Sequence, residues 1–347
     1  MKHKIALILT YIGTLPKHFP LWLKSAGANP DFTFMIFTDA DCSGYNIPGN
    51  VKVIPMTLEG IRKLAAPHLG FECSLKFPYK LCDYKTLNGL IFQDWLKGYD
   101  FWGHVDPDVI WGNLSKFITD DLLDRYSRLY KHGHFELYRN TPKVNSFALH
   151  ELSYWNVSYK DIFRIDKNTG FCEAAITNHL FSNFAVDGGQ YYSHDYADIC
   201  LTRYQFVCID DTKLKESVPA FRWKDGKIFG LSLNGEAGND REYRYVHLPK
   251  RAMKFTPGLE NEDSFMIIPN EFVKDHELTQ EEIKALMTPD PEYERRIAAK
   301  YPPTTFAKKI KSFIFGSRHR KILYFKGLVN RLLGRKLLSV WNTPGSE

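Results

Sequence analysis

The sequence predicts an α/β fold in which a mostly parallel sheet is flanked by helices and followed by a basic helical tail. Over the first 110 residues, apolar runs of strand length alternate with stretches of helical spacing. That chain order builds parallel sheets through right-handed crossovers. The apolar share of 44% and the charged share of 25% are those of a globular protein. Residues 301–347 hold ten Lys and Arg residues and a single acidic residue, Glu347, which predicts the basic tail.

The first three strands are the clearest elements. Residues 5–10 form a continuous apolar run, as expected of a strand buried on both faces. The N-terminus resembles a short signal peptide, but Pro16 and Lys17 follow at once and no small-residue cleavage site is present. We therefore interpret the run as a strand. Residues 32–38 and 51–55 are predicted as the second and third strands.

The next region predicts a long helix and a fourth strand. Residues 79–97 have helical spacing, and Gly98 follows them as a favoured C-terminal stop. Residues 99–110 then form an apolar strand that Pro107 interrupts.

Beyond residue 111 the pattern is mixed and the predicted elements are shorter. Asp225-Gly226 supplies the positive-φ turn of a hairpin, and Thr279 with Glu282 forms a capping box. The predicted strands are 135–139, 204–209 and 244–248, the hairpin is 220–229, and the helices are 173–183 and 280–287. Prolines 289, 291, 302 and 303 predict a linker before the tail.

Cysteine and hydropathy patterns exclude several classes of protein. The six cysteines form no C-x-x-C and no Cys/His cluster with zinc-ligand spacing, so neither a structural zinc nor a thioredoxin-like site is expected. In a chain of this length they are typical of reduced cytosolic thiols. No apolar run reaches the length of a membrane-spanning helix.

The positive charge is concentrated at the C-terminus. The first 300 residues hold 36 basic and 39 acidic residues, whereas residues 306–340 alternate basic and apolar side chains with no acid. Such a pattern predicts basic amphipathic helices that lie on an anionic membrane surface. The alternative is a helical cap packed on the folded part. We expect no nucleic-acid partner, because the folded part is net acidic.

Two carboxylates at the end of the fourth strand are the strongest functional signal. Asp106 and Asp108 flank Pro107, and residues two apart on a strand point to the same side. Converging carboxylates repel each other unless a cation lies between them, and Mg²⁺ or Mn²⁺ prefers such oxygen ligands. Ligands of open α/β sheets bind outside the carboxyl ends of strands. The alternative is a surface turn, in which Asp-Pro-Asp is common.

Three segments together resemble a known family. They are Lys80-Leu-Cys-Asp83-Tyr-Lys85, then Trp102-Gly-His-Val-Asp106-Pro-Asp108-Val-Ile-Trp-Gly, then Tyr245-Val-His247-Leu-Pro-Lys-Arg251. With the strands around them, residues 1–255 resemble the GT-A glycosyltransferases of bacterial capsule and lipopolysaccharide gene clusters. The resemblance implies a GT-A-like, Rossmann-type sheet and transfer of a sugar from a nucleotide-diphosphate donor, expected to be a UDP-sugar.

The resemblance also implies a metal centre and a donor site. Asp108 is the expected direct metal ligand, Asp106 a ligand or ribose contact, and His247 a third ligand to Mn²⁺ or Mg²⁺. For His247 the alternative is a core histidine at a strand end. The expected donor-binding residues are Thr10, Tyr11, Asp39, Lys80, Asp83, Lys85, Asp106 and Lys250. For Lys80 and Asp83 the alternative is an ordinary ion pair between residues three apart.

Glu173 is the residue predicted to act as the catalytic base. It matches an acidic position of the resembled family, although Cys172 stands where that family has another acid. Asp187, Asp195 and Asp198 are its rivals. The sequence leaves open whether the reaction inverts or retains the anomeric configuration, and in a retaining enzyme a base need not be evident.

The predicted organisation follows from these segments. Residues 1–255 form the catalytic domain, with a nucleotide-sugar half (1–112) and an acceptor half (113–255). Residues 256–303 form an extension and linker, and residues 304–347 the basic tail. The acceptor is expected to be a glycan or lipid-linked glycan, which places the enzyme in the cytoplasm, peripherally on the inner face of the membrane. The oligomeric state stays open.

Two other functions fit parts of the sequence. A nucleotidyltransferase shares the α/β layout but would show a Gly-rich, basic loop after the first strand, whereas Tyr11-Ile-Gly-Thr-Leu-Pro has one glycine. A nucleic-acid binder would use the basic tail together with a basic face on the folded part.

Overall fold

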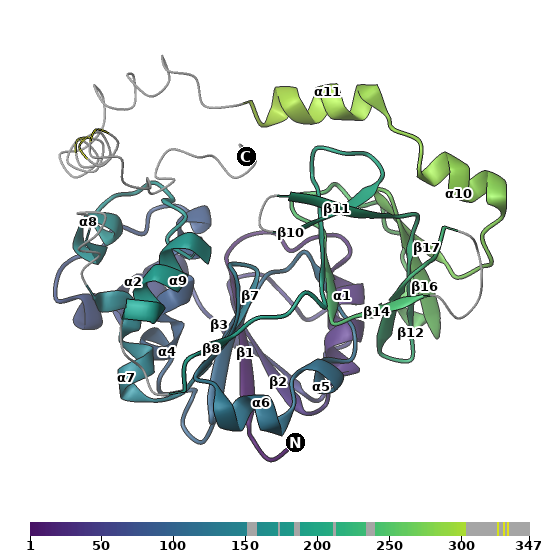
Figure 1. The fold of residues 1–347 in the computed structure, drawn as a ribbon. Helices are drawn as coiled ribbons and strands as arrows, with labels where there is room; N and C mark the ends of the chain where they lie inside the picture. Colours follow the sequence, from purple (N-terminus) through teal and green to yellow (C-terminus); the bar gives the residue numbers. More distant parts are fainter. Residues whose placement is uncertain are drawn as a thin grey trace.

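The computed structural model describes residues 1–150, 158–172, 174–183, 188–210, 213–233 and 240–302, and positions 325, 329 and 332. Within these residues the strands form one large sheet and two smaller sheets (Figure 1). The large sheet has the order β3-β2-β1-β4-β7-β6-β8, the second β11-β10-β9-β15-β5, and the third β14-β13-β12-β16-β17.

The bounds of the strands are as follows. The large sheet contains β1 (Ile5–Tyr11), β2 (Phe32–Thr38), β3 (Val51–Pro55), β4 (Phe101–Val105), β6 (Arg128–His132), β7 (Phe135–Arg139) and β8 (Gln190–Tyr191). The second sheet contains β5 (Val109–Trp111), β9 (Ala197–Ile199), β10 (Phe206–Asp210), β11 (Lys213–Val218) and β15 (Tyr245–His247). The third contains β12 (Phe221–Lys224), β13 (Lys227–Gly230), β14 (Arg241–Tyr243), β16 (Ser264–Ile268) and β17 (Glu271–Lys274).

The predicted α/β class is confirmed. In the large sheet β1, β2, β3 and β4 pair in parallel, as do β6 and β8, while β7 runs antiparallel to its two neighbours. The apolar run of β1 is continuous because both of its faces are covered: Ala6 and Ile8 belong to one core cluster, and Leu7 and Leu9 to another.

Helices cover both faces of the large sheet (Figure 1). On the face of Ala6 and Ile8, side chains of α2, α4 and α9 join the core, and on the other face side chains of α1, α5 and α6 do so. The helices are α1 (Phe19–Gly27), α2 (Leu58–Leu69), α3 (Leu81–Tyr84), α4 (Asn88–Ile91), α5 (Leu114–Phe117), α6 (Asp120–Arg125), α7 (Pro142–Asn145), α8 (Tyr159–Phe163), α9 (Ala174–Asn183), α10 (Gln280–Leu286) and α11 (Pro291–Lys300). The 3₁₀ turns are Pro78–Lys80, Lys85–Leu87, Phe147–Leu149 and Leu259–Asn261.

The predicted long helix over residues 79–97 is wrong. The segment is a series of single turns, in which α3 and α4 alternate with 3₁₀ turns. Gly89 of α4 packs closely on the sheet, because a Cβ at that position would lie 2.5 Å from the indole nitrogen of Trp102 in β4. The chain follows the surface of β4 rather than an ideal helix axis, and tertiary contacts override the local helical spacing.

Two further expectations need correction. The linker predicted over residues 289–303 contains α11, which Asp290 caps by accepting the N–H groups of Glu292 and Tyr293. Helix α2 was not predicted, although Thr57 caps its start and Gly70 ends it at a φ of 71°.

Several smaller predictions are confirmed. The break at Pro107 separates β4 from β5, which belong to different sheets. The hairpin β12–β13 turns at Asp225 and Gly226, both at positive φ, and α10 begins with the predicted capping box.

Strands β12 and β16 pair across residue 255, so the third sheet joins both sides of the predicted domain boundary.

Two findings concern membrane association. Within the described residues, none of the helices has both the length and the apolar character that crossing a bilayer requires. The predicted amphipathic tail, residues 304–347, lies outside the described residues except for three isolated positions.

Candidate metal and nucleotide site

The site lies where β4 leaves the large sheet and β5 enters the second sheet. Asp106 directly follows β4, and Asp108 directly precedes β5. Their carboxylates lie at the carboxyl end of a central parallel strand, the edge at which α/β sheets bind ligands. The indole N–H of Trp22 donates to the backbone oxygen of Asp106 at 3.1 Å, so α1 helps to fix the turn.

The second sheet brings His247 to the same place. Strand β15 pairs antiparallel with β5, with His247 opposite Val109, which is the neighbour of Asp108. The His247 Nε2 lies 3.5 Å from the Asp108 Oδ1. Ligand atoms of Asp106, Asp108 and His247 all lie within 4.8 Å of one another. The three residues expected to bind a metal are thus brought together, although they come from two sheets.

A second group of possible ligands shares His247. It consists of His134, Asp198 and His247, with ligand atoms again within 4.8 Å of one another. The sequence analysis missed His134 as a site residue and considered Asp198 only as a possible base. No local signal identifies them, because His134 lies in the β6–β7 turn and Asp198 in β9, far along the chain from His247.

The pKa of His247 depends on its burial and on two neighbouring carboxylates. Burial alone would lower the pKa of this imidazole, but Asp198 and Asp108 raise it to about 10. In turn, burial would raise the pKa of Asp108, while His247 and the backbone N–H of Lys250 lower it to about 2. Without a metal, a protonated His247 therefore offsets part of the negative charge of Asp108 and Asp198. A divalent cation would replace that proton as their counter-charge.

Lys85 lies beside the metal ligands through its contact with Asp106, and its contact with a donor stays a prediction. Its ammonium donates to the Asp106 Oδ1 at 2.5 Å and to the backbone oxygen of Gly133 at 2.8 Å. Burial lowers the pKa of Lys85, but the Asp106 carboxylate more than offsets this, so that the pKa is raised. Lys85 stays charged, and the second oxygen of Asp106 remains available for a cation.

Direct donor contact by Lys80 and Asp83 does not fit their surroundings. Lys80 Nζ uses all three of its N–H groups within the protein, on Asp83 Oδ2 at 2.6 Å and on the backbone oxygens of Ile162 and Lys167. Asp83 also accepts from the backbone N–H groups of Thr169 and Phe171 and from the Thr169 hydroxyl. Because both side chains are completely buried, this pair anchors residues 162–171 instead.

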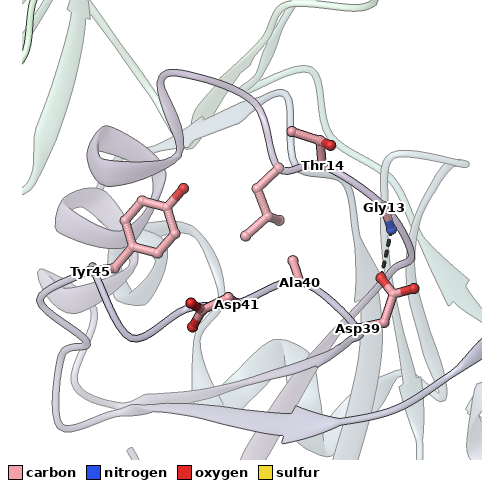
Figure 2. A pocket seen from close by; sticks show the side chains of 7 residues that line it. Gly13, Thr14, Asp39, Ala40, Asp41 and Tyr45 are labelled. Atoms are coloured by element: carbon pink, nitrogen blue, oxygen red, sulfur yellow. Dashed lines mark hydrogen bonds between the residues drawn. The ribbon is translucent and has the colours of Figure 1, made fainter.

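A pocket of about 410 Å³ lies beside the ends of β1 and β2. It is lined by Gly13, Thr14, Leu15, Asp39, Ala40, Asp41 and Tyr45 (Figure 2). Asp39, predicted as a donor contact, accepts the N–H of Gly13 at 2.7 Å and so ties the two sides of the pocket together.

Tyr45, rather than Tyr11, is the aromatic residue of this pocket. The Tyr45 ring and the Asp41 carboxylate both line the pocket (Figure 2). Tyr11 ends β1, and its hydroxyl donates to the Thr14 backbone oxygen at 3.1 Å. Thr10, which precedes it, is partly buried and pairs with Phe37 of β2. The sequence analysis missed Tyr45, which follows β2 without any motif.

Lys250 connects the metal ligands to the C-terminal helix. Its backbone N–H donates to the Asp108 Oδ2 at 3.2 Å, in a left-handed conformation with a φ of 54°, which is uncommon for a non-glycine residue. Its ammonium lies 5.7 Å from the Tyr79 ring centre and 5.4 Å from that of Tyr301. Contact of Lys250 with a phosphate stays a prediction.

The predicted catalytic base lies outside the described residues. This is true of Glu173 and of its rival Asp187. Among the other rivals, Asp195 forms an ion pair with the buried Arg244 at 2.7 Å, and Asp198 accepts from the His247 Nδ1 at 2.7 Å. Asp195 and Asp198 therefore each already bind a basic side chain.

Comparison with known proteins identifies the family of the chain and solved structures that are similar to it. Residues 7–276 match the sequence model of a family of unknown function, DUF6625. The chain belongs to this family. No curated protein matches it. Among solved structures it is similar to the galactosyltransferase LgtC in complex with donor and acceptor sugar analogs, with 11% identity, 84% of this chain and 99% of that chain covered, and a TM-score of 0.36. A TM-score this low supports no argument about activity.

Proposed function

We propose that this DUF6625 protein is a metal-dependent glycosyltransferase that moves a sugar from a nucleotide-diphosphate donor, a UDP-sugar, to a glycan or lipid-linked glycan. One observation carries the proposal: Asp106, Asp108 and His247 converge within 4.8 Å at the carboxyl end of β4. The pocket at the ends of β1 and β2 adds a place for a nucleoside beside them. The GT-A resemblance of the sequence motifs gives the same reaction class.

The three side chains fit a divalent cation. Two carboxylates supply the hard oxygen ligands that Mg²⁺ and Mn²⁺ prefer, and the imidazole favours Mn²⁺ of the two. Asp106, Asp108 and His247 would hold the ion. When bound, such an ion neutralises charge on the leaving diphosphate as a Lewis acid.

The remaining residues orient the donor. The Tyr45 ring offers an apolar face for the base, and the exposed Asp41 carboxylate offers an acceptor for its N–H groups or for the ribose hydroxyls. Lys85 keeps a positive charge next to Asp106. The backbone N–H of Lys250 binds Asp108, and the Lys250 ammonium lies near the Tyr79 and Tyr301 rings. The diphosphate would thus lie among fixed cations. Glu173 remains the proposed base.

The C-terminal contacts support an acceptor at a membrane surface. Helix α11 is anchored by the Arg203–Glu294 ion pair and by the Tyr293 hydroxyl, which donates to the Leu201 backbone oxygen. The residue that follows α11, Tyr301, lies against Lys250 beside the metal ligands. The basic segment 306–340 therefore follows a point at the rim of the site. We propose that it holds the enzyme on anionic lipid, where a lipid-linked acceptor is found.

A nucleotide screen by thermal shift tests the proposal. UDP, GDP, CMP and TDP are added with and without Mn²⁺ to the wild type, to Asp108→Ala and to Asp94→Ala. Asp94 is an exposed control whose ion-pair partner within the described part of the chain is Lys97. One nucleotide at about 100 times its Kd should stabilise the wild type by roughly 2.7 kcal/mol, because ligand binding favours the folded state.

Three outcomes of the thermal-shift screen decide for or against the proposal. A metal-dependent shift that Asp94→Ala keeps and Asp108→Ala loses supports the proposal. A shift that needs no metal and survives in Asp108→Ala contradicts the metal site. If no nucleotide stabilises the wild type, the transferase proposal fails.

A further inference from the structure

Three neighbouring strands align three polar side chains across the second sheet. In register, His247 of β15 lies opposite Asp198 of β9 on one side and Val109 of β5 on the other. Asp108 directly precedes Val109. The sheet therefore fixes the order Asp198, His247, Asp108, and both carboxylates face one imidazole ring.

The two ring nitrogens of His247 have different partners. Nδ1 lies 2.7 Å from the Asp198 Oδ1, and Nε2 lies 3.5 Å from the Asp108 Oδ1. The first distance is that of a charge-assisted hydrogen bond, whereas the second is long for one. A neutral imidazole carries one N–H, and the nitrogen with the closer carboxylate keeps it. This leaves the Nε2 lone pair for a cation on the side of Asp106 and Asp108.

Packing fixes the plane of the same ring. His134 stacks on His247 with the ring centres 4.0 Å apart and an angle of 26° between the planes. The His134 Nε2 is within hydrogen-bond distance of the Tyr245 hydroxyl, at 2.9 Å. His134 is buried in the β6–β7 turn. It meets His247 with its ring face, whereas a metal ligand must point a nitrogen lone pair at the ion.

We propose that Asp198 is a positioning residue, which holds the Nδ1–H of His247 so that Nε2 is the metal ligand, and that the group of His134, Asp198 and His247 holds no ion of its own. This inference rests on the proposed function, because it concerns the same metal. Both groups of possible ligands share the His247 ring. An ion between Asp198 and His247 would need the Nδ1 lone pair and would displace the hydrogen bond that orients the ring. Carboxylates behind ligating histidines act in this way in other metal sites.

Direct Mn²⁺ binding tests the inference without an activity assay. Free Mn²⁺ is counted by electron paramagnetic resonance during a titration of the full chain, with and without UDP. We expect one ion per chain in the wild type. Asp198→Ala should weaken the affinity about 10- to 100-fold, the range for removal of such a partner. Asp198→Asn keeps an oxygen that accepts the Nδ1–H and should stay within about threefold of the wild type.

Three further variants separate positioning from ligation. Asp108→Ala removes a ligand and should abolish binding, whereas Asp94→Ala should leave the affinity unchanged. His134→Gln removes the imidazole but keeps a side chain that can reach the Tyr245 hydroxyl, and the number of bound ions should stay at one. Thermal unfolding of each variant shows whether it folds.

The results that overturn the inference are distinct from those that overturn the proposed function. Two ions in the wild type with one in His134→Gln, equal affinity of folded Asp198→Ala and wild type, or equally weak binding by Asp198→Asn and Asp198→Ala would each refute the positioning role while the transferase proposal stands. A wild type that binds no Mn²⁺, with or without UDP, refutes both.

Discussion

Lys80–Asp83 and Lys85–Asp106 are two Lys–Asp ion pairs whose lysines lie five residues apart, and they serve different purposes. In the first pair both side chains are completely buried, and Lys80 has no N–H group left for a ligand. In the second pair the Asp106 side chain is 24% exposed and lies among the metal ligands. The comparison teaches that a charged motif in a sequence marks a site only where its charges remain accessible.

A third pair completes the comparison at the surface. Lys97 and Asp94 are three residues apart, like Lys80 and Asp83, and their ammonium and carboxylate groups lie 2.7 Å apart. Their side chains are 77% and 69% exposed. The distance is nearly the same in all three pairs, so burial, rather than geometry, should rank the consequences of breaking them.

The largest effect is expected for Lys80→Met. The change leaves a completely buried Asp83 carboxylate with hydrogen-bond donors but no counter-charge, which typically costs about 3–5 kcal/mol. The free energy of unfolding from urea titrations measures it. A loss below about 1 kcal/mol would show that the pair is not the anchor of residues 162–171 described above.

Lys85→Met should lower the free energy of unfolding less than Lys80→Met does. It should also increase the affinity for Mn²⁺. Loss of the charged hydrogen bonds to Asp106 and Gly133 should cost roughly 1.5–3 kcal/mol. Removal of a cation next to Asp106 should also raise the Mn²⁺ affinity roughly three- to tenfold, because like charges repel. Urea unfolding and a Mn²⁺ titration measure the two effects. Weaker Mn²⁺ binding in a folded variant would contradict the expected repulsion between Lys85 and the ion.

Thr169→Val tests how much one hydrogen bond to the buried Asp83 carboxylate contributes to stability. The Thr169 hydroxyl donates to Asp83 at 3.0 Å, while the backbone N–H of Thr169 also donates to it. Valine has nearly the same shape and removes only the hydroxyl, so the expected loss is about 1–2 kcal/mol. The urea midpoint should fall while the Mn²⁺ affinity stays that of the wild type. A change in metal affinity would show that Asp83 is coupled to the site after all.

Lys97→Met should barely change the free energy of unfolding. An exposed pair contributes about 0.5 kcal/mol or less, and salt screens it. Unfolding in low and high salt should therefore give similar stabilities for the variant and the wild type. A loss comparable with that of Lys80→Met would refute the ranking by burial.

Much of the fold could be predicted from local patterns. The apolar runs of β1, β2 and β3 identify strands buried on both faces, and the Asp-Pro-Asp segment identifies a strand end with two carboxylates. The single helix expected over residues 79–97 is instead a series of short turns, of which α4 packs through Gly89 on Trp102 in β4. Helix α11 was missed because its prolines resembled a linker, although Pro291 stands at a position where a helix tolerates it.

The sequence by itself determined the α/β class and the side-chain chemistry at the end of β4, because periodicity and residue type are local properties. The tertiary structure decided which charged groups are accessible: it buried Lys80 and Asp83 and left Asp106 and Asp108 at the site. It also placed Asp198 against His247 through the pairing of β9 with β15. Burial and strand register depend on contacts between distant segments, and no local pattern of residues specifies them.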